Sequence, residues 1–389
     1  MQSANSLAEQ PIDAAHAPFR LALVRQRYNP YGGAERFVER ALNALHGDGL
    51  EITLVTRSWP ESGKHDVIRC APLYFGNVWR DWSFARCVRR RLERKRFDLV
   101  QSHERIAGCD IYRAGDGVHL EWLRARRAEL TGWARLGSYL NPYHWYTLAA
   151  ERSMFDDSRL RKVICNSRMV RDEIRRVFAL PQEKVQVIYN GVDLARYTPA
   201  ARALGAPIRN AYGINDSTTV FLFVGSGFAR KGLAAAIRAL PAHAHLIVVG
   251  KDRKEKHYRR LAEQHCRTVH FVGGQQDVRP FYGAADAFVL PTLYEPFSST
   301  VLEAMACGLP VITTPRNGAS ELIDDGVQGY ICHRAGGPSL SELMDRLCDR
   351  ARREQLGAAA ATRAQDFGLE AMTAQLQQLY TELIGRAVR

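Results

Sequence analysis

The sequence predicts an α/β protein built from two doubly wound parallel sheets. Short apolar segments typical of buried parallel strands alternate with helical patterns in the N-terminal half, and the same alternation begins again after Pro199. With 389 residues, the chain is too long for one ordinary hydrophobic core. We therefore expect a disordered leader over 1–18, a first domain over 19–190, a second over 191–368 and a final helix over 369–389.

Composition narrows the class of protein. Hydrophobic residues make up 46% and charged residues 24%, as expected of a soluble globular protein. No apolar run approaches the roughly 20 residues of a membrane span, and the N-terminus lacks the features of a signal peptide. The eight cysteines have no metal-ligand spacing, so we expect reduced thiols in a cytoplasmic protein. The net charge of +13 lies mainly in the first 190 residues and predicts an anionic partner.

The first domain is predicted to begin with a strand over 20–24, a glycine turn at Gly32 and Gly33, and a helix from Phe37 to Leu45. Paired glycines allow backbone to approach a ligand at the helix N-terminus, although a plain tight turn has the same sequence. The pattern is not GxGxxG, which argues against a dinucleotide oxidoreductase.

A basic helix is predicted over 84–96, between strands at 51–56 and 97–102. Phe84, Val88 and Leu92 form an apolar stripe, and arginines flank it. The helix is therefore either a solvated face with one packed side or a surface that contacts a membrane.

The segment 103–119 follows a strand and is predicted to be a ligand-binding loop. Asp116 and His119 are spaced to reach a common ligand, but Asp116 could equally cap the following helix. The segment 120–148 mixes tryptophan and tyrosine with arginine, which suits a membrane interface, a sugar-bearing acceptor or a packed helical insertion. Strands at 163–166 and 185–188 complete this half.

The second domain is predicted to open with a strand over 220–224, which leads into a glycine loop from Gly225. Arg230 and Lys231 follow just before a helix, where two cations and backbone amides can bind a diphosphate. The alternative is a surface Arg–Lys pair. Lys251 ends another strand, over 245–249, and could face a nucleobase.

A further strand, near 287–290, runs into a loop with Glu295 and then a helix that starts near Ser298 or Ser299 and stops at Gly308. Helix N-termini attract phosphate, and two carboxylates beside one could orient sugars. The alternative is a surface Glu295 and a solvated Glu303. Strands near 270–272 and 311–314 complete the second alternation.

Together these segments resemble the family-4 retaining glycosyltransferases over nearly the whole chain. The resemblance rests on GGAE at 32–35, NGVD at 190–193, GSGFARKG at 225–232, EPFSSTVLEAMACGLPV at 295–311 and the final helix. CDIYRAGDGVH at 109–119 is similar to bacterial lipopolysaccharide-core glucosyltransferases. The resemblance implies the GT-B architecture, in which two Rossmann-like domains face each other across a cleft and the C-terminal helix crosses back to the first.

The same resemblance implies roles for individual residues. Glu303 would hold the ribose diol and Glu295 the hexose, while Asp116 and His119 would lie near the transferred sugar and the acceptor. The diphosphate and the rest of the donor would contact Gly32, Gly33, Gly225, Arg230, Lys231, Lys251, Ser298, Ser299 and Thr300. The family often has glycine where this chain has Ser298. No metal or other cofactor is expected.

The implied reaction transfers a hexose, glucose from UDP-glucose, to a lipid-linked oligosaccharide with retention of configuration. It would take place on the inner face of the cytoplasmic membrane, with the protein bound peripherally to the anionic surface. Alternatives are a sugar-nucleotide epimerase or synthase on the same fold, a non-catalytic nucleotide-sugar binder, or a nucleic-acid binder. No nucleic-acid motif supports the last of these.

Overall fold

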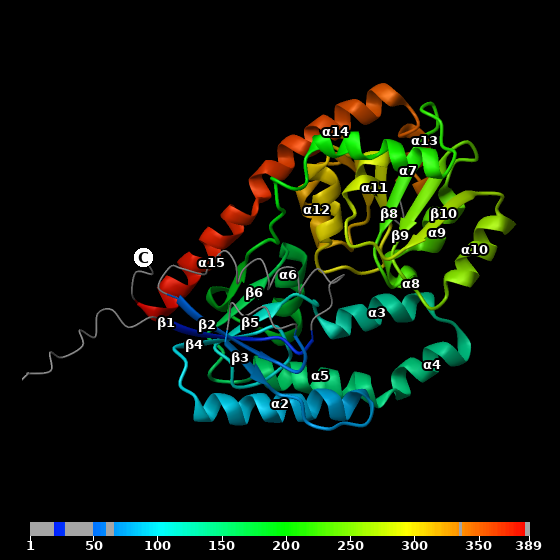
Figure 1. Cartoon of the computed structure of the whole chain (residues 1–389). Helices are drawn as coiled ribbons and strands as arrows, with labels where there is room; N and C mark the ends of the chain where they lie inside the picture. Colours follow the sequence, from blue (N-terminus) through cyan, green and yellow to red (C-terminus); the bar gives the residue numbers. More distant parts are fainter. Residues whose placement is uncertain (1–18, 28–49, 60–65, 334–336, 386–389) are drawn as a thin grey trace, which may run out of the picture.

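Two α/β domains make up the protein, seen in a computed structural model that describes residues 19–27, 50–59, 66–333 and 337–385 (Figure 1). In these residues the first sheet has the order β3-β2-β1-β4-β5-β6-β7, and the second has the order β10-β9-β8-β11-β12-β13. Adjacent strands are parallel throughout both sheets. The predicted doubly wound fold is confirmed.

The strands of the first sheet are β1 (Phe19–Val24), β2 (Leu50–Thr56), β3 (Asp66–Arg69), β4 (Leu99–Ser102), β5 (Ile111–Ala114), β6 (Lys162–Cys165) and β7 (Val185–Val187). Those of the second are β8 (Val220–Val224), β9 (His245–Val249), β10 (Thr268–Gly273), β11 (Ala287–Leu290), β12 (Val311–Thr313) and β13 (Gly329–Ile331). Strand order reverses between β1 and β4 and between β8 and β11. Ligands of open α/β sheets bind outside the carboxyl ends of strands at such switch points.

Helices cover both faces of each sheet. In the first domain they are α2 (Gly76–Arg94), α3 (His119–Glu129), α4 (Gly132–Leu140), α5 (Pro142–Phe155) and α6 (Arg168–Phe178). In the second they include α7 (Ala206–Ala211), α8 (Phe228–Lys231), α9 (Leu233–Ala239), α10 (Glu255–Gln264), α11 (Arg279–Ala284), α12 (Ser299–Ala306), α13 (Leu340–Arg346) and α14 (Arg350–Ala364). None of the described helices combines the length and apolar character needed to cross a membrane.

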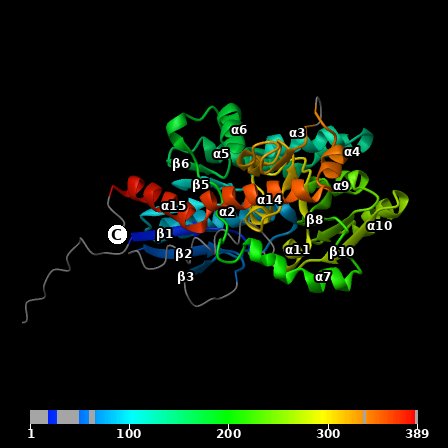
Figure 2. The same cartoon turned by 90° about the horizontal axis from the view of Figure 1, so that it is seen from above.

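The last helix, α15 (Leu369–Ile384), returns to the first domain, as predicted. Met372, Leu376 and Leu379 join the cluster of buried side chains that includes Leu21 of β1. Viewed from above, α14 and α15 follow one another from the second domain to the first (Figure 2). The two chain crossings between the domains also contact each other, because the Val192 N–H donates to the Phe367 carbonyl at 2.9 Å and the Leu369 N–H donates to the Val192 carbonyl at 3.1 Å.

Several predicted elements needed correction. The helix predicted from Phe84 begins eight residues earlier, at Gly76. The prediction missed its first turns because their polar and aromatic residues do not continue the apolar stripe. The loop predicted over 103–119 contains strand β5, whose apolar pattern is interrupted by the buried Arg113. The segment 120–148 folds into α3, α4 and most of α5. The leader 1–18, Gly32, Gly33 and the helix from Phe37 to Leu45 lie outside the described residues.

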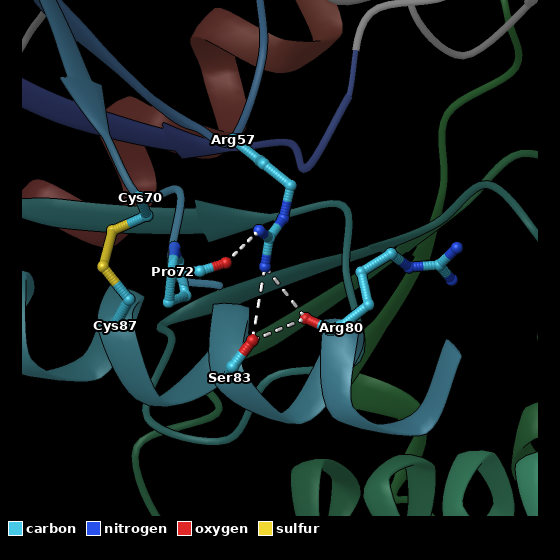
Figure 3. Close-up of a disulfide and its surroundings, with 6 residues drawn as sticks. All are labelled: Arg57, Cys70, Pro72, Arg80, Ser83 and Cys87. Carbon is cyan, nitrogen blue, oxygen red and sulfur yellow. Dashed lines mark hydrogen bonds between the residues drawn. A yellow bond between two sulfur atoms is a disulfide. The ribbon is translucent and has the colours of Figure 1, made fainter. Parts of the chain in front are cut away.

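The expectation that every cysteine is a reduced thiol is wrong for one pair. Cys70, just after β3, forms a disulfide with Cys87 in the middle of α2, with their Cα atoms 5.7 Å apart (Figure 3). The remaining six cysteines are free. Arg57 fastens the same region, since its guanidinium donates to the carbonyls of Pro72 at 2.6 Å and Arg80 at 3.1 Å. The segment between β3 and α2 is therefore fixed on both sides.

Candidate functional site

A carboxylate and two cations meet at the carboxyl ends of β8 and β11 in the second domain. The Glu295 carboxylate lies 2.8 Å from the Lys231 ammonium and 2.5 Å from the Arg230 guanidinium. Burial raises the pKa of Glu295, but Lys231 and Arg230 outweigh that effect and hold the pKa below its usual value. Lys231 is only 8% exposed. The predicted diphosphate-binding cations and Glu295 therefore form one ionised cluster, in which Lys231 is buried and the side chains of Arg230 and Glu295 are 36% and 13% exposed. The alternative of a surface Arg–Lys pair is excluded.

Gly225 gives Lys231 its position. The loop leaves β8 with φ +146° at Gly225, and a Cβ atom there would lie 2.5 Å from Cδ and Cε of Lys231. The lysine side chain thus lies directly against glycine backbone. On the adjacent strand end, after β9, the Lys251 N–H donates to Ser226 Oγ at 3.3 Å, so the backbone of Lys251 flanks the same loop.

Helix α12 points its N-terminus into this region. Its N-cap residue, Ser298, makes no side-chain hydrogen bond to the first turn, and Ser298 Oγ instead lies 2.9 Å from Thr300 Oγ1. The Ser298 N–H donates to Asn317 Oδ1 at 3.2 Å, which fixes the entry to the helix although serine replaces glycine. The first-turn amides at Ser299 and Thr300 can therefore serve an anion, as helix N-termini commonly do.

Glu303 lies on the same helix, one turn beyond Ser299. It is 1% exposed, and its carboxylate accepts a hydrogen bond from the Tyr282 hydroxyl at 3.1 Å. Burying a carboxylate costs free energy unless it is hydrogen-bonded, and the Tyr282 hydroxyl supplies such a bond. The alternative of a solvated Glu303 on the helix surface is therefore wrong. Glu295 lies in the loop before the helix, and Glu303 lies in its second turn.

The first domain contributes two residues to this region that sequence analysis missed. Asn190 Nδ2 lies 3.4 Å from Ser299 Oγ, and Asn190 Oδ1 accepts from Arg113 Nη2 at 2.6 Å. Burial lowers the pKa of Arg113 to about 9. Both residues lie in segments that carry the family resemblance, NGVD and CDIYRAGDGVH, but neither was given a role, because only the folded chain brings them to Ser299.

A small polar pocket of about 130 Å³ lies in the first domain beside Asp116. Most of the charged side chains in its lining have a partner: Arg80 lies 2.6 Å from Asp81, while Arg105 and Glu104 lie 2.9 Å and 3.4 Å from partners outside the lining, Glu151 and Arg25. Asp116 is half-exposed and lies 4.0 Å from Arg105. Tyr143 and Tyr146 also line the pocket. Paired charges and tyrosines in one hollow suit a ligand rich in hydroxyl groups, because they offer many donors and acceptors with little net charge.

Asp116 and His119 do not face one another. The His119 imidazole lies 3.2 Å from His144 and stacks on Trp122 with ring centroids 5.4 Å apart. Burial, the nearby Arg105 and His144 lower the pKa of His119 to about 3, so the ring is neutral at physiological pH. Asp116 makes no cap for α3 either, since the N-cap position is Val118 and it has no side-chain cap.

Glu151 of α5 is the residue that anchors this loop, and no local sequence pattern pointed to it. It is 1% exposed and accepts from the His119 N–H at 3.2 Å as well as from Arg105. One carboxylate thereby holds the start of α3 on one side and the guanidinium nearest Asp116 on the other. The spacing from Arg105 to Glu151 is 46 residues, far beyond any local motif.

The two domains contact each other directly through Tyr294. Its hydroxyl donates to the Glu173 carboxylate of α6 at 2.7 Å and accepts from the Val118 N–H at 3.0 Å. A Cβ atom on Gly117, where φ is +67°, would lie 2.3 Å from this hydroxyl. A second contact places the Glu321 carboxylate of the second domain on the N–H groups of Arg168 and Met169, at 2.9 and 2.6 Å, at the N-terminus of α6.

We expect stability to fall as the pH rises from about 4.5 to about 7, because burial raises the pKa of Glu173 from 4.5 to about 7. Below this window Glu173 is protonated in both states. Within it the folded protein binds the extra proton, and that advantage disappears once the pH exceeds the folded-state pKa. Thermal unfolding measured across this range should show the decline, and Glu173→Gln should flatten it. An equal decline in the variant would contradict the assignment.

Comparisons with known proteins cover both domains. Residues 31–196 match the family described as Glycosyltransferase Family 4, and residues 206–363 match the family described as Glycosyl transferases group 1. The chain is 26% identical to the lipopolysaccharide glucosyltransferase WaaG of Escherichia coli (strain K12) over 328 residues, which cover 80% of this chain and 84% of WaaG.

Solved structures show the same fold. The crystal structure of WaaG matches with a TM-score of 0.79 and 24% identity, covering 93% of this chain and 99% of that chain. Anabaena HepE in complex with UDP-glucose matches with a TM-score of 0.70 and 20% identity, with coverage of 93% and 99%. The fold of these structures thus matches nearly the whole of this chain.

Proposed function

The chain belongs to the glycosyltransferases, with a family 4 domain and a group 1 domain on the GT-B fold, and from this premise we propose that it transfers glucose from UDP-glucose to a lipid-linked oligosaccharide of the lipopolysaccharide-core type. The observation that carries the proposal is the ionised cluster of Arg230, Lys231 and Glu295 beside the N-terminus of α12. The likeness to WaaG supports the sugar and the acceptor class, and the UDP-glucose complex of HepE supports the nucleotide.

The Glu295 carboxylate forms ion pairs with Lys231 and Arg230. A donor diphosphate would take over these cations together with the amides of Ser299 and Thr300, and it would free Glu295 to accept from the hexose hydroxyls. Glu303 would bind the ribose, and Gly225 and Lys251 would flank the nucleotide. Gly32 and Gly33 keep their predicted place on the phosphate side, as part of this proposal.

Transfer breaks the bond between the anomeric carbon and the UDP oxygen and forms a bond from the same carbon to the acceptor oxygen. The acceptor proton passes to the departing diphosphate on the same face, which gives retention without a carboxylate nucleophile. The charge that develops on the diphosphate is stabilised by Lys231, Arg230 and the helix N-terminus. These groups carry the electrostatic role, and the proposed reaction uses no metal or other cofactor.

The acceptor is proposed to enter the polar pocket beside Asp116. Asp116 would accept a hydrogen bond from an acceptor hydroxyl, and Arg105 would hold the carboxylate in place. The catalytic part proposed for His119 becomes one of positioning, since its ring faces His144 and Trp122 while its N–H anchors the loop to Glu151.

A lipid-linked acceptor places the protein at a membrane, on the cytoplasmic face. Helix α4 and the start of α5 support a peripheral location, because Trp133 of α4 is 87% exposed and Leu140 of α4 and Trp145 of α5 are exposed as well. The alternative that the segment 120–148 is a packed helical insertion is wrong for α4. Exposed aromatic residues that alternate with arginines are typical of proteins that lie on a membrane surface.

A thermal-shift panel of UDP-, GDP- and ADP-sugars tests the donor assignment. We expect UDP-glucose to raise the melting temperature of the wild-type protein, and Lys231→Ala and Glu303→Ala to abolish the shift, since only the folded state binds the ligand. Incubation with UDP-glucose and no acceptor should leave the sugar unchanged, whereas an epimerase would convert it. If no nucleotide sugar shifts the melting temperature, the proposed donor site is wrong.

A further inference from the structure

Tyr294 joins the two loops on which the proposed reaction depends, although no role was predicted for it. It immediately precedes Glu295 in the segment 291–298, between β11 and α12, which we call the donor loop. Its hydroxyl accepts a hydrogen bond from the Val118 N–H at 3.0 Å. Val118 lies two residues beyond Asp116 in the segment 115–118, between β5 and α3, which we call the acceptor loop. One phenol group thus connects the donor loop of the second domain to the acceptor loop of the first.

The backbone of the acceptor loop is shaped to receive this hydroxyl. Gly117 has φ +67°, and a Cβ atom there would overlap the Tyr294 hydroxyl and lie 2.8 Å from Cγ of Pro296. The Gly117 carbonyl accepts a hydrogen bond from Arg105 Nη2 at 3.2 Å, and the same guanidinium lies 4.0 Å from Asp116. The acceptor loop is therefore held by the first domain through Arg105 and by the second domain through Tyr294.

Glu173 of α6 fixes the direction of the Tyr294 hydroxyl. The hydroxyl donates to the Glu173 carboxylate at 2.7 Å, and the two side chains are 1% and 5% exposed. A phenol has a single hydrogen to donate, so its oxygen lone pairs remain for the Val118 N–H. Both hydrogen bonds thus depend on the same oxygen atom, and a phenylalanine at this position would remove both without removing the ring.

A second contact holds the donor loop against the same helix, α6, which faces the second domain (Figure 1). The Glu321 carboxylate accepts from the N–H groups of Arg168 and Met169 at the start of α6, at 2.9 and 2.6 Å. The segment that carries Glu321 is joined to the donor loop in turn, because the Gly318 N–H donates to the Glu295 carbonyl at 2.9 Å. The Tyr294 hydroxyl therefore approaches the acceptor loop from a frame that is anchored at two points.

We propose that Tyr294 is a positioning residue for glycosyl transfer, whose hydroxyl sets the acceptor loop, and with it Asp116, at a fixed distance from Glu295. The inference rests on the proposed function, which supplies the roles of Asp116 and Glu295. The two loops belong to different domains, so no shared sheet fixes the distance between them. That distance matters because a misplacement of about 1 Å between reacting groups can cost about 100-fold in rate. Tyr294 would contact neither substrate and would act only through the position of the acceptor loop.

Tyr294→Phe in the full-length protein tests the proposal. We expect kcat for glucosyl transfer to fall about 10- to 100-fold, because the acceptor loop loses its contact with the second domain. The Kd for UDP-glucose, measured by isothermal titration calorimetry, should stay within about threefold of wild type, since the hydroxyl takes no part in donor binding. Tyr330→Phe is the matched control: Tyr330 is a buried tyrosine of the second domain whose hydroxyl accepts from Arg352 Nε at 3.1 Å. Its kinetics should equal those of wild type, and a kcat for Tyr294→Phe as high as that of this control would overturn the proposal.

A double-mutant cycle shows whether Tyr294 acts through Asp116. In the Asp116→Asn background, adding Tyr294→Phe should lower the rate by less than about threefold, because the group that the hydroxyl positions is already altered. A loss as large as in the wild-type background would show that the hydroxyl does not act through Asp116 and would overturn the proposal. Glu173→Gln keeps an oxygen that can accept from the hydroxyl, so its rate of transfer should stay within about threefold of wild type.

Hydrogen exchange tests the positioning of the acceptor loop independently of the reaction. The exchange of peptides that contain Val118, followed by mass spectrometry, should be faster in Tyr294→Phe by about fivefold, the equivalent of one lost hydrogen bond, and unchanged in Tyr330→Phe. If the wild-type protein transfers no glucose, the proposed function fails, and faster exchange in Tyr294→Phe alone would still show that Tyr294 holds the acceptor loop. Unchanged exchange in Tyr294→Phe would overturn the inference even if glucose transfer by the wild-type protein is confirmed.

Discussion

Lys231→Ala is expected to lower kcat/KM for glucosyl transfer by about 100- to 1000-fold, the usual cost of removing one preorganised group that stabilises developing charge. Lys231 is the most buried cation of the site and lies 2.8 Å from Glu295, in the position proposed for the diphosphate. The loss should appear mainly in kcat, because the charge on the leaving group grows toward the transition state. Steady-state kinetics with UDP-glucose measures it.

Lys256→Ala is the matched control, since Lys256 is an exposed lysine on α10 of the same domain. We expect its kinetics to equal those of the wild type. Circular dichroism should show both variants folded, so that a lost activity reports the site. A fall of less than about threefold for Lys231→Ala would be far below what an oxyanion-stabilising group contributes and would remove this lysine from the proposed mechanism.

Glu151→Ala is expected to destabilise the fold by about 3–5 kcal/mol, the typical cost of breaking a buried ion pair from one side. The substitution leaves the buried Arg105 guanidinium without its closest acid and leaves the N–H of His119 without its acceptor. Glu151→Gln keeps an oxygen for these donors and should lose less. Urea unfolding followed by circular dichroism measures both changes.

The control for this pair is Glu183→Ala, at an exposed glutamate of the same domain, for which a change within about 0.5 kcal/mol is expected. Glu151→Gln should also lower the rate of transfer, because the loop that carries Asp116 is anchored by this carboxylate. A stable Glu151→Ala protein with full activity would show that the buried contacts around Arg105 have no structural role.

Features carried by short segments were predictable from the sequence. Lys231, Gly225 and the start of α12 lie within a few residues of strand ends, and parallel strands bring such ends to one edge of a sheet. Five of the strands described in the second sheet, β8 to β12, were predicted from their apolar runs, which are typical of strands buried on both faces, whereas the short edge strand β13 was not. Edge strand β3 has no such run, because its residues are half-buried or exposed, and it was missed.

Features made by distant residues were not predictable. Tyr294 and Glu173 are 121 residues apart, and Arg105 and Glu151 are 46 apart. Neither pair has a spacing that a helix or strand period would reveal. The disulfide is similar, because Cys70 and Cys87 meet only once α2 has packed beside β3. His119 was predicted to lie at the transferred sugar because it is three residues from Asp116 along the chain. The direction of its ring, however, depends on His144, which comes from α5.

The returning helix α15 makes the first domain dependent on the end of the chain. The hydrophobic core of the first domain includes Met372, Leu376 and Leu379. During synthesis this core therefore cannot be completed until these last residues have left the ribosome, although the first domain is synthesised before the second. The paired backbone hydrogen bonds between Val192 and the 367–369 segment also join the two crossings into a narrow ribbon. Any opening or closing of the two domains should therefore be a hinge rotation about this pair of segments. Sliding of one domain past the other would require the Val192 hydrogen bonds to break.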